Sequence, residues 1–358
     1  MNATTTLREH PTSGPHGADV AAGKPAAKHG TLASDWIVYA PLVATTVFSK
    51  FSIPPLAERG LGIGLPLVFL TLGIGLALNR VRFHGGRLCY FSLLIVTLGA
   101  MQMFHQRFSM MSFIYLTAVC FAYTLLVPRA NGKFPESANV FMNMVLFICL
   151  CGIAQFLLQF IAGKSFAFPI ETFTPKGFIV EGFNYLNRLS LSSSVLKSNG
   201  LFLLEASFFS QLLAIGIVTE LATYQRTWRL VLLALGMTFS YSGTGILVLA
   251  CGLPIVMLAN RRADLILVFV AVAMLTYVFA EPLRLDIFLG RIGEFSSTAS
   301  SASMRFTSWL PLFENVLFND SIHTVVGYGA GSFLGVASQN PYPVAEIMHA
   351  KIFIEYGL

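Results

Sequence analysis

The feature that most constrains the fold is a succession of apolar segments, each about as long as a membrane is thick. An α-helix needs about 20 mainly apolar residues to cross the hydrocarbon layer. Only 11% of the 358 residues are charged, whereas soluble domains contain about 25%. The sequence therefore predicts an all-α, polytopic transmembrane helix bundle of about ten or more spans. The predicted spans are residues 35–54, 61–79, 88–105, 110–128, 138–162, 200–222, 229–241, 243–260 and 263–280, and one that begins near 347.

Both ends of the chain differ from this pattern. Residues 1–34 contain no apolar run of signal-peptide length, and their Ala, Gly, Pro and Thr content predicts a disordered tail. The membrane domain is then 35–358. Its last span is still in progress at Leu358, so we expect a longer natural protein with further spans. Spans 229–241 and 243–260 almost touch and could be two helices that meet at a tight turn or one long broken helix. We expect the turn, because Gly243 and Gly245 allow backbone angles that other residues avoid.

Basic residues predict the orientation of the bundle. Arg and Lys concentrate in alternate connectors, at 80–87, 129–137, 223–229 and 261–262. The positive-inside rule places these connectors, and the N-terminal tail, in the cytoplasm. Two long loops, 163–199 and 281–348, then share the opposite face, which is the periplasmic face of the inner membrane in a bacterium. Topology explains much of the net charge of +6, which therefore does not indicate nucleic-acid binding.

The two long loops contain the cations that are best placed to bind a substrate. Lys197 and Arg188 belong to the first loop, and Arg305 and Arg291 belong to the second. Arginine holds phosphate oxygens through two parallel hydrogen bonds, and lysine acts as a point charge. Anchoring to lipid headgroups would explain any one of these residues alone. Cations from two loops on one face favour phosphate binding.

Two residues could act as general bases. Glu205 lies in span 200–222, where a carboxylate is costly unless it faces a polar cavity or a cation. The alternative is an interfacial glutamate that reaches water. His349 opens the last span, and a histidine exchanges protons near neutral pH. The alternative is a histidine that merely lies at the membrane surface.

Several kinds of site have no motif in the sequence. All five cysteines lie in apolar runs, which predicts neither a disulfide nor a thiolate metal site. We find no Gly-rich phosphate loop, no zinc motif and no serine nucleophile elbow. The sequence therefore predicts no metal and no cofactor.

Three stretches of the second half form a recognisable set. The first is Lys197–Ser207, in which Lys-Ser-Asn-Gly-Leu-Phe leads into Glu-Ala-Ser. The second is Thr238–Leu247, with Thr-x-Ser-x-x-Gly before an apolar helix. The third combines Arg305–Trp309, Gly327-Tyr-Gly329 and His349-x5-Glu355-x-Gly357. Together they resemble the superfamily of O-antigen ligases and of O-antigen and exopolysaccharide polymerases (Wzy-like and WaaL-like membrane glycosyltransferases).

This resemblance implies a metal-independent, inverting glycosyltransferase with a periplasmic active site. The implied donor is a glycan linked by pyrophosphate to a polyprenyl lipid, and the implied partners are that lipid-linked oligosaccharide, membrane lipids, chain-length regulators and export proteins. His349 or Glu205 would take the proton from the acceptor, and Arg305 would stabilise the leaving group. The residues implied to bind the pyrophosphate are Lys197, Arg305, Arg291 and Arg188.

Other functions make different predictions from the same residues. Within the superfamily, the Glu-x-Ser element favours a polymerase, which joins lipid-linked repeat units, over a ligase, which transfers glycan to lipid A core. A lipid-linked glycan transporter or flippase would place ionisable groups near the middle of the bilayer, where these spans have almost none. A non-catalytic subunit of a secretion complex would tolerate the loss of Arg305 and His349.

Overall fold

The computed structural model describes most of the chain from Trp36 onward. The described residues are 36–54, 56–105, 108–126, 134–189, 193–260, 303–304, 307–340 and 343–357, with the backbone alone at 59 and 134–136. The predicted tail 1–34, the predicted span 263–280, and Arg291 and Arg305 lie outside these residues.

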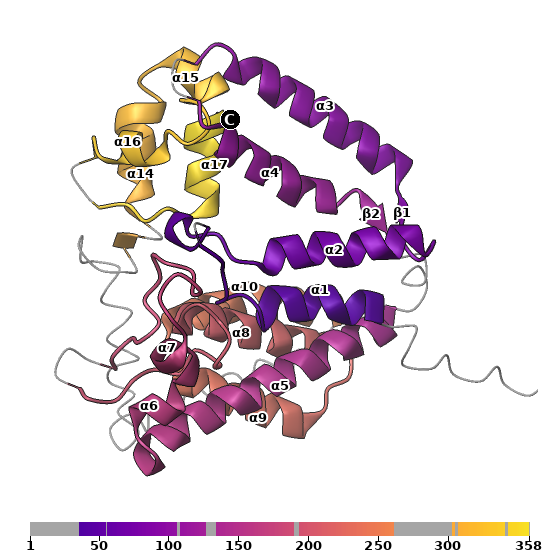
Figure 1. Cartoon of the computed structure of the whole chain (residues 1–358), viewed down its shortest axis with the longest axis vertical. Coiled ribbons are helices and arrows are strands. Elements are labelled where there is room, and N and C mark those ends of the chain that lie inside the picture. Colours follow the sequence, from indigo (N-terminus) through magenta and orange to yellow (C-terminus); the bar gives the residue numbers. More distant parts are fainter. Residues whose placement is uncertain are drawn as a thin grey trace, which may run out of the picture. The chain divides into compact units, whose positions relative to one another are not determined.

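The described chain is mostly helical, as the sequence predicts. One antiparallel pair, β1 (Arg82–Phe83) with β2 (Leu125–Leu126), joins the ends of two helices (Figure 1). The helices are α1 (Trp36–Thr46), η2 (Ala57–Arg59), α2 (Gly64–Ala77), α3 (Gly85–Gln102), α4 (Met110–Ala122), α5 (Phe134–Ile161), α6 (Lys164–Ala167), α7 (Pro169–Phe173), α8 (Ala206–Ala222), α9 (Thr227–Ser240), α10 (Gly243–Asn260), α14 (Trp309–Leu312), η5 (Phe313–Leu317), α15 (Ser321–Val326), α16 (Phe333–Ala337) and α17 (Met348–Tyr356).

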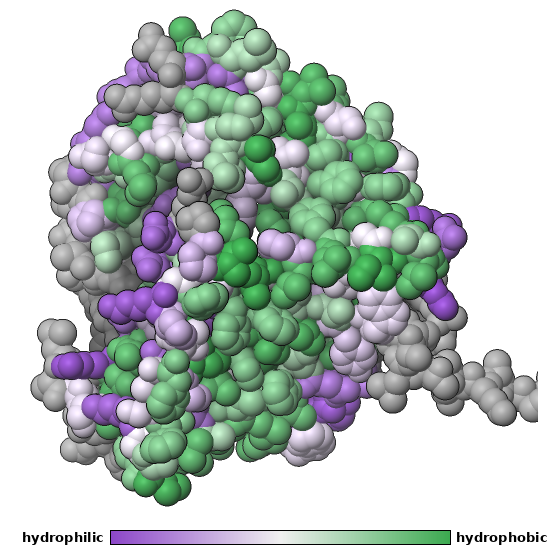
Figure 2. Space-filling view, viewed as in Figure 1, coloured by the Kyte–Doolittle hydropathy of each residue, from purple (hydrophilic) through white to green (hydrophobic). Residues whose placement is uncertain are grey.

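Two of the described helices are long and apolar enough to cross a membrane, Ser137–Ile161 within α5 and the whole of α10. Neither contains a charged residue, and only 33% and 11% of their most apolar stretches are buried. A core helix of a soluble protein would hide its apolar surface, so this exposure indicates association with a membrane. Figure 2 shows hydrophobic side chains across α1, α2 and α4, with hydrophilic ones near the end where β1 and β2 lie.

Four of the other predicted spans are shorter as helices: α1, α2, α4 and α8. A fifth apolar helix of 10–17 residues among the described residues, α9, begins two residues before the predicted span 229–241. The predicted span 35–54 was too long, because α1 ends at Thr46. The chain then pairs with the loop before α8, where the Val180 amide donates to the Lys50 carbonyl at 2.9 Å. Lys50 is therefore outside the helix.

The start of α8 also differs from the prediction. Gly200 and Leu201 both take positive φ angles, 72° and 67°, which a right-handed helix cannot contain. The helix begins only at Ala206, and Glu205 is its N-cap residue in an extended conformation. Glu205 is thus held in front of the helix and not inside the span.

Helices α5, α8 and α9 share the largest hydrophobic cluster of the described chain, which includes Met142, Ile148, Phe209, Leu213 and Leu233. Glycines let these helices approach closely. A Cβ at Gly216 of α8 would lie 2.7 Å from Cγ1 of Val145, and one at Gly236 of α9 would lie 2.6 Å from Sγ of Cys149. Small residues at helix contacts are typical of membrane bundles, where apolar burial alone does not drive association.

The tight turn predicted between 241 and 243 is confirmed, but for a different reason. Tyr241, not a glycine, takes the left-handed conformation, with φ of 43°. Gly243 and Gly245 lie in α10. A Cβ at Gly245 would lie 2.7 Å from the Ser210 carbonyl oxygen, so this glycine allows α10 to pack against α8.

A second cluster forms around α17. Its buried members include Leu312, Phe313, Phe333 and Ile354. The turn Gly327–Gly329 closes on the end of α17, since the Tyr328 amide donates to the Ile354 carbonyl at 2.8 Å and the Gly329 amide donates to the Glu355 carbonyl at 3.1 Å. Two parts of the third sequence stretch therefore lie in direct contact.

Candidate functional site

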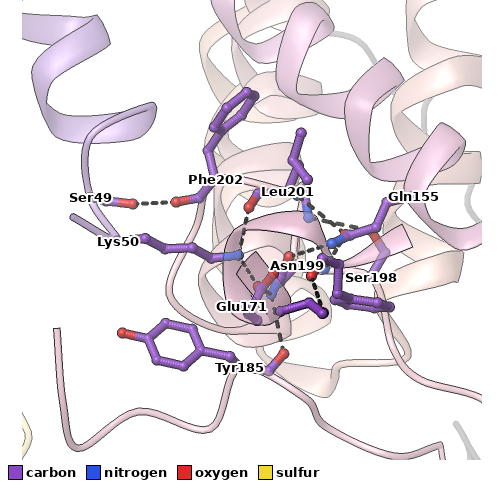
Figure 3. A network of polar contacts seen from close by, with 12 residues as sticks. Ser49, Lys50, Gln155, Glu171, Tyr185, Ser198, Asn199, Leu201 and Phe202 are labelled. Carbon is purple, nitrogen blue, oxygen red and sulfur yellow. Dashed lines mark hydrogen bonds and ion pairs between the residues drawn. The ribbon is translucent and has the colours of Figure 1, made fainter. Parts of the chain in front are cut away.

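A buried polar cluster lies in front of α8, where the first sequence stretch begins. We define it as Lys50, Gln155, Glu171, Tyr185, Ser198 and Asn199 (Figure 3). These residues come from the α1–α2 connector, from α5, from α7 and from the segment before α8. Burying a polar group costs free energy unless the group is hydrogen-bonded, so these side chains must bond to one another.

Lys50 is the centre of the cluster. Its side chain is fully buried and its Nζ forms an ion pair with Oε1 of Glu171, whose side chain is 4% exposed. The same ammonium donates to the Leu201 carbonyl at 2.5 Å. Leu201 is the residue with the strained left-handed backbone, and strain of this kind persists only where surrounding contacts hold it. Lys50 therefore fixes the shape of the segment that carries Lys197 and Glu205.

Gln155 of α5 holds the same segment from the other side. Its Oε1 accepts from the Ser198 hydroxyl at 3.0 Å, the Asn199 amide at 3.1 Å and the Leu201 amide at 3.2 Å. Its Nε2 donates to Oδ1 of Asn199 at 3.0 Å, and Nδ2 of Asn199 donates to Glu171 at 3.0 Å. Figure 3 shows these side chains converging from separate elements. The network links α5, α7 and the pre-α8 segment into one unit.

The pKa of Lys50 gives the cluster a pH dependence. Burial lowers this pKa from 10.5 to about 8, against the opposing charge of Glu171. Between these two values the unfolded chain holds the proton more firmly, so the free energy of unfolding rises as pH increases from about 8 to 10.5, and it is lower and constant below this window. We expect this rise in SDS unfolding titrations of the native chain but not in the Lys50→Met variant. Equal slopes in the two proteins would contradict the assignment.

Lys197 and Glu205 are buried beside the cluster, each 7% exposed. The Glu205 carboxylate accepts from the Asn184 amide at 3.2 Å and from the Ser207 hydroxyl at 3.0 Å. Burial raises the pKa of the Tyr185 phenol above its usual range, and the charges of Glu171 and Glu205 add to this effect. Both carboxylates therefore lie near Tyr185. Glu205 is therefore buried and hydrogen-bonded, and its role as a general base that faces a polar cavity stays a prediction.

The second sequence stretch packs directly on the first. The Thr244 hydroxyl donates to the Ser207 carbonyl at 3.1 Å, and the Gly245 amide donates to the Ser210 hydroxyl at 3.1 Å. The Ser198 amide donates to the Phe239 carbonyl at 3.0 Å. Two stretches that are about 40 residues apart in the sequence thus form one structural unit around Glu205.

The other predicted site residues lie elsewhere. Arg188 is exposed and forms an antiparallel bridge with Leu196, so it borders the buried segment. His349 is exposed at the start of α17, and its ring meets Trp309 edge to face at 5.3 Å. Arg305 and Arg291 are outside the described residues, so their predicted roles stay predictions. Within the described ranges, no group of three or more His, Cys, Asp or Glu side chains could hold a metal ion.

Sequence reasoning missed Lys50 and Gln155, which hold the site together. Lys50 was counted within an apolar span, although a lone lysine in such a run is itself a signal of a buried partner. Beside the ion pair of Lys50 and Glu171, the arrangement supplies a further buried cation, Lys197, and a carboxylate, Glu205, oriented by two hydrogen bonds. It can bind an anionic group and accept a proton from a hydroxyl.

Comparisons with known proteins do not assign this chain to a family. No family model matches the sequence, and neither curated proteins nor solved structures yielded a match.

Proposed function

We propose that this chain is a polysaccharide polymerase that joins polyprenyl-pyrophosphate-linked repeat units on the periplasmic face of the bacterial inner membrane. The observation that supports it is the direct packing of the first and second sequence stretches around buried Lys197 and Glu205. In this proposal the described helices belong to a bundle of about ten spans, and the N-terminus is cytoplasmic.

The proposed reaction is a direct displacement. A hydroxyl of the acceptor glycan attacks the anomeric carbon of the donor, the bond from that carbon to the pyrophosphate oxygen breaks, and the configuration inverts. Glu205 or His349 takes the hydroxyl proton. Lys197 and Arg305 stabilise the charge that develops on the departing lipid pyrophosphate, while Arg188 and Arg291 guide its approach.

The charge distribution favours an enzyme over a transporter. The two described helices that can cross a membrane contain no ionisable residue that would line a substrate path, whereas transporters place such groups or broken helices near the midplane. The buried ionisable pair of Lys50 and Glu171 lies instead in the α1–α2 connector and in the short helix α7, outside the two helices that can cross.

The test uses the full-length protein in liposomes with a defined polyprenyl-pyrophosphate oligosaccharide and no other enzyme. We expect a ladder of lipid-linked multiples by gel and mass spectrometry. Removing one cation that stabilises developing charge costs about 10²–10³-fold in rate, so Lys197→Ala and Arg305→Ala should each lower polymer formation by this factor. Lys176→Ala, which removes an exposed lysine of the same loop, is the matched control and should keep the full rate.

The other outcomes distinguish the alternatives. Transfer that occurs only after lipid A core is added would make the chain a ligase. Movement of the lipid across the bilayer without a new glycosidic bond would identify a transporter. Normal polymer from both Lys197→Ala and Arg305→Ala would reject the catalytic roles of these two residues. Neither a new glycosidic bond nor movement of the lipid under any of these conditions would favour a non-catalytic subunit.

A further inference from the structure

A second buried ionic group lies at the opposite end of α8 from the polar cluster. Glu220 is fully buried. Arg226 donates two hydrogen bonds to its carboxylate, Nε to Oε1 at 2.7 Å and Nη2 to Oε2 at 2.8 Å. The remaining nitrogen of Arg226, Nη1, donates to Asn139 at 3.1 Å. This pair is therefore neutral overall, and each nitrogen of the Arg226 guanidinium makes a hydrogen bond.

Arg229 stands next to this pair without a carboxylate of its own. It is only 9% exposed, and Nη2 donates to Oδ1 of Asn143 at 2.9 Å. Its Nε and Nη1 are buried and have no hydrogen-bond partner in the described part of the chain. A buried guanidinium with unused donors is costly. Its carbon lies 5.1 Å from the centre of the Trp228 ring, and the described residues supply no acceptor for these two nitrogens.

The start of α9 adds a second, independent preference for an anion. This 14-residue helix has no side-chain cap and no acidic residue in its first turn. The Arg226 amide at this end already donates to Oε1 of Glu220 at 3.0 Å, and the positive end of the helix dipole attracts further negative charge. Arg229 belongs to this first turn, so a cation and an uncapped helix end meet at one place.

The outer face of α9 indicates what carries the anion. Trp228, Val231 and Leu235 follow one another at helical spacing and are 53%, 60% and 41% exposed. Residues at i, i+3 and i+7 share a face. Tryptophan is enriched at the level of the lipid headgroups, and the apolar face continues from it along the helix. An anion bound at Arg229 would therefore have acyl-chain surface beside it.

We propose that Arg229 and the N-terminus of α9 bind the phosphate of an anionic phospholipid whose acyl chains lie along Trp228, Val231 and Leu235. This site goes beyond the proposed polymerase and is separate from the polar cluster. It requires that the chain lies in a membrane, not that it transfers sugar. Its success or failure is therefore independent of the outcome of the liposome assay.

The test compares three probes on the full chain purified in detergent: phosphatidylglycerol, diacylglycerol with the same acyl chains, and inorganic phosphate. We expect phosphatidylglycerol to raise the thermal stability and to be retained in native mass spectrometry, whereas the other two have little effect. Arg229→Gln should weaken phosphatidylglycerol binding about tenfold or more, since charge-assisted hydrogen bonds are lost. Arg82→Gln, which removes an exposed arginine, is the control and should bind normally.

Arg229→Lys is a second variant that tests the site even if Arg229→Gln does not fold. It keeps the charge but loses the planar fork, so we expect a folded protein with weakened phosphatidylglycerol binding. Unchanged binding by both Arg229 variants would overturn the site. Stabilisation by inorganic phosphate as large as that by phosphatidylglycerol would overturn the lipid assignment, and equal stabilisation by diacylglycerol would overturn the role of the phosphate.

Discussion

Replacing Lys50 with Met is expected to lower the free energy of unfolding by about 3–5 kcal/mol, the usual cost of breaking a buried ion pair by removing one partner. Lys50 is fully buried and Glu171 is 4% exposed, so water cannot compensate the carboxylate that remains. The Leu201 carbonyl also loses its donor. Met has a similar length and is unbranched, so the variant tests charge and hydrogen bonding more than packing. SDS unfolding titrations at pH 7 measure the change.

Two further variants isolate the ion pair. Lys176→Met removes an exposed lysine from the loop that contains Glu171 and should change stability by less than about 0.5 kcal/mol. The double variant Lys50→Met with Glu171→Gln should recover much of the loss, because replacing both partners of a buried pair is far less costly than removing one. A Lys50→Met effect no larger than that of the control would show that the buried pair is not a stabilising feature.

Gly327→Ala is expected to destabilise the cluster around α17 by about 2–5 kcal/mol, adding the cost of a positive φ to that of overpacking. Gly327 has φ of 73°, and a Cβ there would lie 2.5 Å from the backbone carbonyl carbon and oxygen of Glu355 and from the nitrogen of Tyr356. Backbone atoms cannot rotate away as a side chain can. The turn Gly327–Gly329 would have to separate from the end of α17, which proteolysis within 307–340 should detect.

Gly182→Ala separates the two causes. Gly182 also has a positive φ, 90°, but a Cβ there would meet nothing within 4 Å. This variant should cost only the conformational part, about 1–2 kcal/mol. If Gly327→Ala and Gly182→Ala lowered the stability equally, the close approach of the turn to α17 would not be the cause of the Gly327→Ala effect.

The sequence predicted the apolar helices better than the segments that connect them. Periodic or continuous apolar runs of sufficient length identify helices such as α5 and α10 directly. The predicted start of α8, at residue 200, was wrong. Leu201 is an ordinary helix former, but it takes a left-handed conformation that only distant contacts maintain. The donor to its carbonyl is Lys50, 151 residues away. No local pattern contains that information.

The candidate site could be predicted only in part, because some of its residues stand out by their type and others only by the distant contacts that they make. Lys197 and Glu205 stand out because charged residues are rare near apolar spans, and both proved to be buried. Gln155 does not stand out, since a glutamine in a long apolar helix has many explanations. Its role depends on three donors from residues 198–201, which the fold brings to it.

The separation between Lys50 and Glu171 also sets an order of events during synthesis. The two residues are 121 positions apart, and ribosomes add about 5–20 residues per second. Lys50 therefore emerges roughly 6–24 s before its counter-charge exists, by the same rate. An uncompensated ammonium is expelled from hydrocarbon, so during this interval α1 must keep its end near water. If the chain crosses the membrane as proposed, α1, the first of the described helices, takes its final position only after α7 has been made and the lysine can be enclosed.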